Sequence, residues 1–265
     1  MKQQFAVMGN PIHHSLSPFI HEGFARQTGI ALSYKKIEID LACFEQQVTD
    51  FFNQGGKGLN ITLPCKHRAF IMSDIATRRC LRAQAANTLW RDANNVLHAD
   101  NTDGVGLLRD LTRYIDLTNK RILLLGAGGA AHGILEPLLS TKPFELIITN
   151  RSPEKALALS LAFPPAKSAM KEELQGSFDL IINATSASLT AEITTLSTSC
   201  LTSKTICYDL AYQRQGHTPF VEWAQSNGCI GIDGLGMLVE QAAEAFYIWH
   251  DVRPETTSIL KELAP

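Results

Sequence analysis

One segment, Arg121-Ile-Leu-Leu-Leu-Gly-Ala-Gly-Gly-Ala-Ala131, carries the strongest structural signal of the chain. Its apolar first half predicts a short strand, and the three glycines predict a tight turn into an alanine-rich helix. Such a turn exposes backbone N–H groups at the positive end of a helix dipole, where a pyrophosphate binds well. The pattern is typical of a dinucleotide-binding fingerprint with Ala131 in the third small position, although a turn that only packs helix on strand is the alternative. The residues expected to contact the dinucleotide are Gly126, Ala127, Gly128, Gly129 and Ala130.

The next expected strand, Glu145 to Thr149, ends in residues that favour NADP over NAD. An NAD site usually carries an acidic side chain there, but Asn150-Arg151-Ser152 follows this strand. A guanidinium binds a 2′-phosphate through two charge-assisted hydrogen bonds. The alternative is that Arg151 and Lys155 are solvated charges and that Ser152 only caps a helix. We therefore expect NADP(H), bound by Asn150, Arg151, Ser152 and Lys155.

Composition and charge narrow the class of protein. With 265 residues, 45% of them hydrophobic, the chain is long enough for one or two soluble globular domains. A net charge of −2 gives no reason to expect nucleic acid or a membrane surface as partner. No signal-peptide core is visible, and no apolar run approaches the roughly 18 residues that span a bilayer. The six scattered cysteines lack zinc spacing, which predicts reduced thiols, a cytoplasmic protein and no metal site.

Strands and helices also alternate ahead of the fingerprint, so a second α/β domain is expected there. The expected strands are 5–8, 34–39 and 58–62, with a hairpin over 87–97; the expected helices are 18–27 and 41–52. Further strands at 180–182, 205–208 and 229–232 follow the fingerprint, and helices at 238–250 and 255–263 end the chain. We expect a two-domain α/β fold: an N-terminal substrate domain of residues 1–102 and 237–265, and a Rossmann-like dinucleotide domain of residues 103–236.

Polar clusters follow the expected strands of the first domain. Gly9 to Pro18 carries Ser15 and Ser17 near a helix start, which suits a small carboxylate or phosphate; the alternative is that Ser17 is a simple N-cap. In Asn60-Ile-Thr-Leu-Pro-Cys-Lys66, alternation places Asn60 and Thr62 on one face of a strand that the proline then breaks.

Two further clusters are Asn87-Thr88 and Asn101-Thr-Asp-Gly104. Each has an ordinary structural interpretation, because a lone lysine such as Lys66 is normally a solvated charge and Asp103 would serve as a helix cap.

Taken in order and at these separations, the blocks resemble shikimate dehydrogenase. The Ser-x-Ser-Pro, Asn-x-Thr-x-Pro-x-Lys, Asn-Thr-Asp-x-x-Gly and Asn-Arg-Ser blocks match that family between Gly9 and Gln241, nearly the whole chain. The resemblance implies NADPH-dependent reduction of 3-dehydroshikimate to shikimate, in the route to chorismate and aromatic amino acids. It implies a small-molecule substrate, and the sequence leaves open whether the chain is a monomer or a homodimer.

The resemblance also implies roles for single residues. Lys66 and Asp103 match the catalytic pair, and a cation beside the substrate carbonyl would stabilise the negative charge that reduction leaves on its oxygen. We expect Lys66 to polarise this oxygen, while proton donation by Lys66 stays open. The substrate-binding matches are Ser15, Ser17, Thr62, Asn87, Tyr212 and Gln241. The matches at the nicotinamide end are Asn183-Ala-Thr185-Ser186, Gly234 and Met237.

Three positions depart from the family pattern. Ser188 and Gln84 replace usual glycines, and Cys65 stands where a bulkier residue is common. The nearest alternative function is a quinate/shikimate dehydrogenase with relaxed substrate or cofactor choice. An S-adenosylmethionine methyltransferase and a non-catalytic NADP sensor are more distant alternatives. Arg151 argues against the methyltransferase, and the presence of Lys66 argues against the sensor.

Overall fold

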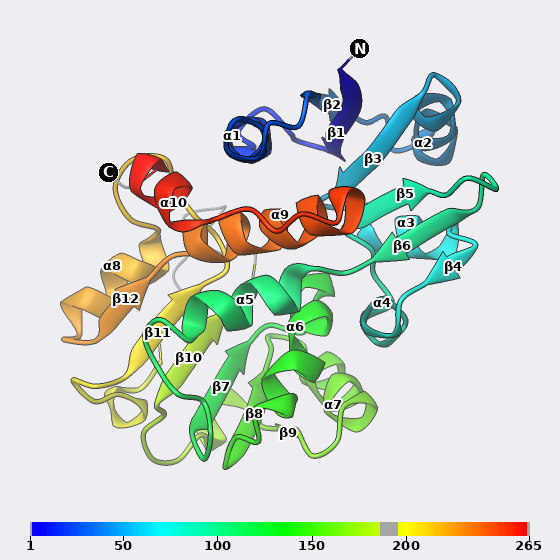
Figure 1. Cartoon of the computed structure of the whole chain (residues 1–265). Helices are drawn as coiled ribbons and strands as arrows, with labels where there is room; N and C mark the ends of the chain where they lie inside the picture. Colours follow the sequence, from blue (N-terminus) through cyan, green and yellow to red (C-terminus); the bar gives the residue numbers. More distant parts are fainter. Residues whose placement is uncertain (1, 186–195, 264–265) are drawn as a thin grey trace. The chain divides into compact units, whose positions relative to one another are not determined.

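The computed structural model describes residues 2–185 and 196–263, and the chain divides into two compact units (Figure 1). Unit 1 contains Met1–Leu107 and Leu238–Ala264, and unit 2 contains Leu108–Met237. The chain leaves unit 1 within helix α5 (Asp103–Leu111) and returns within helix α9 (Leu235–His250). Each unit has its own six-stranded sheet with helices, which confirms the predicted α/β class. The division of roles between domains bounded at 102/103 and 236/237 stays a prediction.

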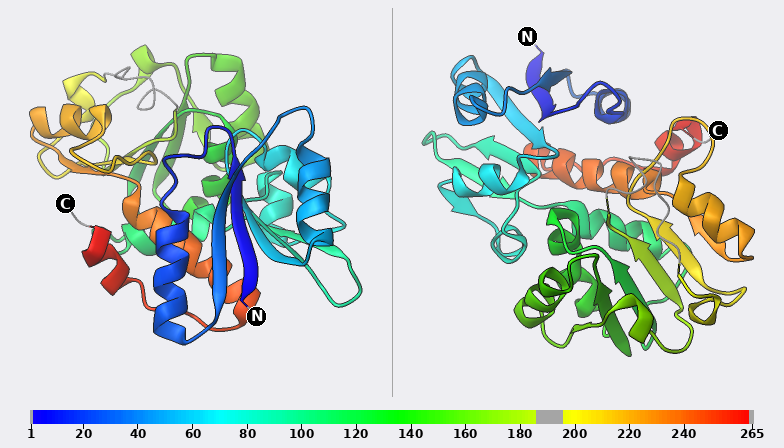
Figure 2. Two further views of the ribbon diagram at one scale, coloured as in Figure 1. Left: turned by 90° about the horizontal axis from the view of Figure 1, so that it is seen from above. Right: turned by 180° about the vertical axis from the view of Figure 1, so that it is seen from behind.

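The sheet of unit 1 is mixed and has the order β2-β1-β3-β5-β6-β4. Its strands are β1 (Gln3–Gly9), β2 (Leu32–Glu38), β3 (Gly56–Ile61), β4 (Ile75–Ala76), β5 (Thr88–Arg91) and β6 (Leu97–Asp100). The connections from β1 to β2 and from β2 to β3 run in opposite directions across the sheet. Because parallel crossovers are right-handed, they place α1 (Ser17–Thr28) and α2 (Phe44–Asn53) on opposite faces. The left view of Figure 2 shows these two helices on either side of β1.

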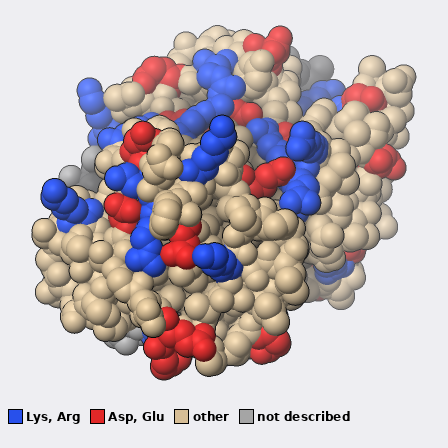
Figure 3. Space-filling view, turned by 90° about the horizontal axis from the view of Figure 1, so that it is seen from below, with Lys and Arg blue, Asp and Glu red and all other residues tan. Residues whose placement is uncertain are grey.

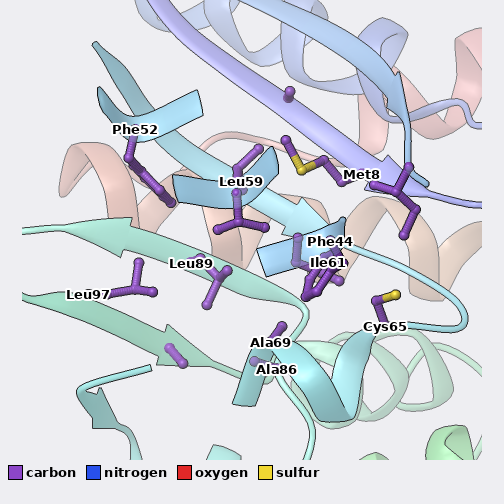
Figure 4. Packing of buried hydrophobic residues seen from close by; sticks show 14 of the residues in the cluster. Met8, Phe44, Phe52, Leu59, Ile61, Cys65, Ala69, Ala86, Leu89 and Leu97 are labelled. Carbon is purple, nitrogen blue, oxygen red and sulfur yellow. The ribbon is translucent and has the colours of Figure 1, made fainter. Parts of the chain in front are cut away.

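An apolar layer lies between α2 and the sheet. Phe44, Val48 and Phe52 recur every four residues along α2, and all three are buried. They pack on strand residues that Figure 4 shows from close by, among them Met8, Leu59, Ile61 and Leu89. Burying each large apolar side chain stabilises the fold by roughly 1.5–3 kcal/mol. This layer therefore holds the carboxyl ends of β1 and β3 firmly in place.

The other face of the sheet carries an aromatic cluster around His21 of α1. The His21 ring is fully buried and stacks on Tyr34, with 4.3 Å between ring centroids. Trp249 of α9 lies 5.3 Å from the same ring. Burial, and after it the nearby His250, lowers the pKa of His21 to about 3. His21 is therefore neutral and serves as an aromatic core residue.

The sheet of unit 2 is parallel throughout and has the order β12-β11-β10-β7-β8-β9. Its strands are β7 (Arg121–Leu125), β8 (Glu145–Thr149), β9 (Lys167–Ser168), β10 (Leu180–Asn183), β11 (Ile206–Asp209) and β12 (Ile230–Ile232). The chain runs outward from β7 to β9, then outward from β10 in the other direction. Right-handed crossovers therefore place α6 (Gly129–Ser140) and α7 (Pro153–Ala162) on one face and α8 (Pro219–Ser226) on the other.

In Figure 1, α6 and α7 lie together and apart from α8. This is the Rossmann arrangement, in which ligands bind beyond the carboxyl ends of the two central strands, here β7 and β10.

Several local expectations need correction. Leu16 occupies the N-cap position of α1 and Ser17 is its first helical residue, so Ser17 is not the cap. The helix expected from residue 41 begins at Phe44, because the Asp40 carboxylate accepts a hydrogen bond from the Ala42 N–H and holds a turn there.

The sequence interpretation missed α3 and α4, which are too short to show a helical period. Among residues 2–185 and 196–263, the remaining helices are α3 (Lys66–Ile71), α4 (Arg78–Ala83), α10 (Thr257–Leu263) and the 3₁₀ turns Lys171–Glu173 and Thr198–Cys200.

Over residues 2–185 and 196–263, no helix combines the length and apolar character that crossing a bilayer requires. The same ranges contain no group of three His, Cys, Asp or Glu side chains arranged to hold a metal ion. All six cysteines are free thiols. On the face drawn in Figure 3, acidic and basic side chains are interspersed, in keeping with the small net charge.

Replacing His21 with phenylalanine should weaken the acid sensitivity of the fold. The unfolded chain binds a proton at this position below about pH 6.5, whereas the native state does so only near its pKa of about 3. Stability is therefore lost as the pH falls through this window. Between pH 7 and pH 5 the His21 contribution to the loss is about 2 kcal/mol. Urea unfolding of wild type and His21→Phe at both pH values measures the difference.

The matched control is Phe24→Leu, a change in the same aromatic cluster that adds and removes no titrating group. It should lower the free energy of unfolding by the same amount at both pH values. A His21→Phe variant with the pH dependence of wild type would contradict a neutral, buried ring.

Candidate active site

One edge of the unit-1 sheet gathers the polar clusters of the sequence. β1 and β3 are parallel, so their carboxyl ends meet at this edge. β5 is antiparallel to β3 and β6 is antiparallel to β5, so β5 starts at this edge and β6 ends there. The register pairs Asn60 with Thr88, and Thr88 with Asp100. The segments that follow β1, β3 and β6, and the segment that precedes β5, therefore become neighbours.

Lys66 and Asp103 form an ion pair at this edge. Lys66 is the first residue of α3, Asp103 is the first residue of α5, and Lys66 Nζ lies 2.6 Å from Asp103 Oδ2. The two side chains are 18% and 8% exposed, so little water screens the pair. The Ala86 N–H donates to the Lys66 carbonyl at 2.8 Å, which ties the start of α3 to the segment before β5. The ammonium is thus held in one place.

Asn87 connects the ion pair to the rest of the edge. Its buried amide Nδ2 donates to Asp103 Oδ1 at 2.8 Å, to Thr102 Oγ1 at 2.9 Å and to Gln241 Oε1 at 3.2 Å. Its Oδ1 accepts from the Thr102 N–H at 2.9 Å. One oxygen of the Asp103 carboxylate therefore faces the lysine and the other faces the amide. Both oxygens are fixed in direction, and a ligand here would meet an ammonium, a carboxylate and two amides.

Ser15 and Ser17 lie at the start of α1, after the carboxyl end of β1. The Ser15 hydroxyl lies 3.1 Å from the Ser17 hydroxyl and accepts the Ser17 N–H at 3.2 Å. Thr62 follows β3, and its N–H donates to the carbonyl of Met8 at 2.9 Å. A Cβ on Gly9 would lie 2.3 Å from the Thr62 methyl, so the strand end needs glycine at that contact. Hydroxyl groups at a helix start suit a carboxylate.

The sequence interpretation missed a supporting layer of this edge. Tyr34 donates from its hydroxyl to Asn60 Oδ1 at 2.7 Å, and Asn60 Nδ2 donates to the carbonyl of Asn87 at 3.1 Å. Tyr34 is buried in β2, between half-buried Ser33 and exposed Lys35, and its hydroxyl needs a hydrogen-bond partner there. Thr102 belonged to a recognised block but received no role. Its Oγ1 donates to Gln241 Oε1 at 3.3 Å.

Two of the three departures from the family pattern, Gln84 and Cys65, lie among the described residues. Gln84 has a φ of +49°, the left-handed region that glycine adopts most easily, and it ends α4. Cys65 is 1% exposed and packs in the apolar layer beneath α3. Ser186 and Ser188 lie outside the residues that the structure describes.

The fingerprint glycines of unit 2 fall into two kinds. Gly126, directly after β7, has a φ of +107°, and its N–H donates to the carbonyl of Thr149 at 2.8 Å. A Cβ there would lie 3.1 Å from the Ala184 carbonyl and from the Thr185 methyl. Gly126 is therefore required by the protein itself, where the chain turns at the carboxyl ends of β7 and β10.

Gly128 and Gly129 differ, because a Cβ on either would meet nothing within 4 Å. Gly128 has a φ of −94° and is the N-cap of α6, without a side-chain capping bond. Folding therefore does not need glycine at these positions, whereas a ligand that approaches the backbone closely does. The uncapped N–H groups of the first turn supply donors for a phosphate. Ala127 and Ala130 flank them half-buried, so the turn fits a dinucleotide.

The residues after β8 fit the extra phosphate of NADP. Ser152 is the N-cap of α7, as expected, but its side chain makes no capping bond. Asn150 Nδ2 instead donates to the Ser152 carbonyl at 3.1 Å and shapes the turn. Arg151 and Lys155 are exposed at the same helix start. A free hydroxyl and two cations at a helix N-terminus suit a phosphate dianion.

The remaining candidates follow the carboxyl ends of β10 and β11. Thr185 donates from its hydroxyl to Asn183 Oδ1 at 2.7 Å. Gly234 donates its N–H to the Ala211 carbonyl at 2.9 Å, and a Cβ there would lie 2.3 Å from the Leu210 carbonyl oxygen. Tyr212 is half-buried just beyond β11, and Met237 is 9% exposed. Of the six expected substrate residues, Tyr212 alone belongs to unit 2.

Known families match the chain along almost its whole length. The models for the shikimate dehydrogenase substrate binding domain, the shikimate/quinate 5-dehydrogenase and the shikimate 5′-dehydrogenase C-terminal domain match residues 7–89, 109–235 and 234–263. A protein of Legionella pneumophila (strain Lens) named shikimate dehydrogenase (NADP(+)) is 56% identical over 263 residues, which cover 99% of each chain.

Solved structures show the same relationship. An Ael1 enzyme from Pseudomonas putida superposes with a TM-score of 0.92 at 45% identity, over 100% of this chain and 99% of that one. Shikimate 5-dehydrogenase from Thermus thermophilus, solved in complex with NADP(H) and shikimate, superposes with a TM-score of 0.88 at 29% identity, over 98% of each chain. On these full-length matches, together with the polar edge and the dinucleotide turn, the chain belongs to the shikimate dehydrogenase family.

Proposed function

We propose that this chain catalyses the reversible reduction of 3-dehydroshikimate to shikimate with NADPH. The observation that carries the proposal is the ion pair of Lys66 and Asp103, 2.6 Å apart and joined to the buried amide of Asn87. An isolated lysine would be a solvated charge, but this one is held beside a carboxylate and faces little water. The name of the 56% identical relative, shikimate dehydrogenase (NADP(+)), supports the same reaction and coenzyme.

In this proposal, hydroxyl and amide groups of unit 1 orient the substrate. The hydroxyls of Ser15 and Ser17, at the start of α1, and the hydroxyl of Thr62, after β3, donate to its carboxylate. Asn87 and Gln241 bind ring hydroxyls with their amides, and Tyr212 adds a further contact. Binding through several directed groups fixes the ring and lowers the entropic part of the barrier.

Lys66 polarises the carbonyl group that is reduced. As negative charge develops on the carbonyl oxygen, the ammonium stabilises it without reorganisation, since Asp103 already holds the side chain in place. Asp103 also accepts a hydrogen bond from a substrate hydroxyl, and Asn87 keeps its second oxygen oriented. The reduced nicotinamide of NADPH, when bound, supplies the hydride, and a proton from Lys66 or from solvent water completes the new hydroxyl group.

Unit 2 holds the coenzyme in this proposal. The pyrophosphate binds at the start of α6, against Gly126, Ala127, Gly128, Gly129 and Ala130. The 2′-phosphate binds Asn150, Arg151, Ser152 and Lys155 after β8. Thr185, Gly234 and Met237 line the nicotinamide end. We also propose that the enzyme acts as a monomer or homodimer in the cytoplasm, where its six thiols stay reduced.

The direct test is the oxidation of shikimate or quinate by the purified chain, with NADP or NAD, followed by the ultraviolet absorbance of the reduced coenzyme. Shikimate with NADP should give the highest kcat/KM, because Arg151 and Lys155 favour the phosphorylated coenzyme. No reduction of NADP by shikimate would refute the proposed function. A higher kcat/KM for quinate would instead support the broader shikimate/quinate activity that the family model over residues 109–235 includes.

Replacing Lys66 with alanine should lower kcat strongly and leave NADPH binding nearly unchanged. Loss of one group that stabilises the developing oxyanion costs roughly 2.7–4 kcal/mol, or about 10²–10³ in kcat. Steady-state kinetics give kcat, and NADPH fluorescence titration gives the dissociation constant. Lys57→Ala removes an exposed lysine of β3 and should match wild type in both. A Lys66→Ala enzyme with near-normal turnover would exclude the polarising role.

Replacing Arg151 with alanine should have the opposite pattern. The KM for NADPH should rise by roughly tenfold or more, because hydrogen bonds to a charged group contribute about 1.5–3 kcal/mol each. The KM for NADH, which lacks the 2′-phosphate, should change little. Lys204→Ala removes an exposed cation next to the amino end of β11 and serves as the control. Equal increases in the KM for NADPH and the KM for NADH would show that Arg151 does not bind the 2′-phosphate.

A further inference from the structure

We infer that Tyr208 and Asp110 are positioning residues for the coenzyme: together they fix the backbone turn that carries Met237. This inference rests on the proposed function, in which Met237 lies at the nicotinamide end. Neither Tyr208 nor Asp110 had a role in the sequence interpretation, and neither is a proposed ligand. All three residues belong to unit 2.

The Tyr208 hydroxyl lies at the start of α9. Met237 is the third residue of α9, and the Tyr208 hydroxyl is close enough to its N–H for the N–H to favour charge on that oxygen. The hydroxyl donates to Asp110 Oδ2 at 2.7 Å. Burial and the nearby Asp110 raise the pKa of Tyr208, so its hydroxyl keeps the proton that it donates. A tyrosine from β11 thus holds the Asp110 carboxylate beside the first turn of α9.

Asp110 holds the same turn from a second side. Its carboxylate is 1% exposed, and Arg113 pairs with it one helical turn further along. A Cβ on Gly236 would lie 2.0 Å from Asp110 Oδ1, so the backbone of the turn passes directly against this carboxylate. Asp110 cannot swing aside freely, because Tyr208 and Arg113 both hold it. Gly236 is therefore the residue that lets the turn approach so closely.

Two more contacts complete the turn. The Leu235 N–H donates to Asp233 Oδ1 at 3.1 Å, and the Gly234 N–H donates to the carbonyl of Ala211 at 2.9 Å. The backbone of residues 233–237 is thus held by groups from α5, from β11 and from the segment after β11. Directed hydrogen bonds define position more narrowly than apolar packing, which tolerates sliding. The start of the Met237 side chain is therefore fixed before any coenzyme binds.

The test is the conservative variant Tyr208→Phe, which removes one hydroxyl and keeps the ring. The dissociation constant for NADPH, measured by fluorescence titration, should rise roughly threefold to tenfold, the effect of losing one supporting hydrogen bond. The KM for shikimate should stay within about twofold of wild type, because its proposed ligands belong mainly to unit 1. Amide hydrogen exchange over residues 233–240 should become roughly tenfold faster, since Asp110 loses the hydroxyl that holds it against this turn.

The matched control is Thr205→Val. Thr205 is fully buried, directly precedes β11, and donates its hydroxyl to the carbonyl of Phe178 at 2.8 Å. The change removes a hydroxyl of similar burial and similar bond length at the opposite end of the same strand. It should lower the melting temperature and leave NADPH binding and exchange over residues 233–240 as in wild type.

Gly236→Ala provides a second, independent variant, because its new methyl group collides with Asp110. It should weaken NADPH binding in the same direction as Tyr208→Phe. Wild-type NADPH affinity in both variants, or an equal loss in Thr205→Val, would overturn the inference. A wild-type chain that binds NADPH without oxidising shikimate refutes the proposed function, while the same affinity comparison still decides the positioning inference. A chain that binds no NADPH overturns both.

Discussion

The contact between the Lys66 ammonium and the Asp103 carboxylate, 2.6 Å apart and largely shielded from water, is the interaction on which the site depends. Two partly buried charges carry a desolvation cost that each alone would not recover. The structure offsets this cost with directed partners: the second oxygen of Asp103 accepts from Asn87, and Asn87 is itself fixed by Thr102. The consequence is chemical, because a pre-oriented ammonium can stabilise charge that develops on a bound carbonyl oxygen.

The need to hold the Lys66–Asp103 ion pair in a fixed orientation explains how unit 1 is built. Apolar side chains fill both faces of the sheet, and the polar groups collect at the edge where β1, β3 and β6 end and β5 begins. Strand ends are suited to carrying polar site residues. The groups just beyond a strand are free of the backbone hydrogen bonds between strands, and those same bonds hold the strand itself in place. Tyr34 and Asn60 extend the same network beneath the edge and tie it to β2.

In unit 2, hydrogen-bonded polar side chains likewise collect at the carboxyl edge of the sheet, which is parallel. The carboxylate of Asp209, which is fully buried, accepts from the Thr218 hydroxyl at 2.6 Å and from Asn183 Nδ2 at 3.1 Å. Asn183 then holds Thr185, as Tyr208 holds Asp110. Buried polar side chains at the strand ends thus orient the backbone around the dinucleotide turn, whereas the glycines of that turn leave room for a ligand.

Local patterns in the sequence were sufficient to predict the parts of this protein that depend on neighbouring residues. The glycine turn at Gly126, most strands and helices, and the cationic end of β8 at Arg151 all follow from period, propensity and charge over a few positions; the two-residue strands β4 and β9 do not. The blocks that resemble the family added the candidate residues. Tertiary structure alone decided which of them meet: that Asp103 and Lys66 pair follows from strand order and register, and these depend on contacts between distant segments. For the same reason Tyr208 had no visible role, because its partner Asp110 is distant in sequence and no period links the two.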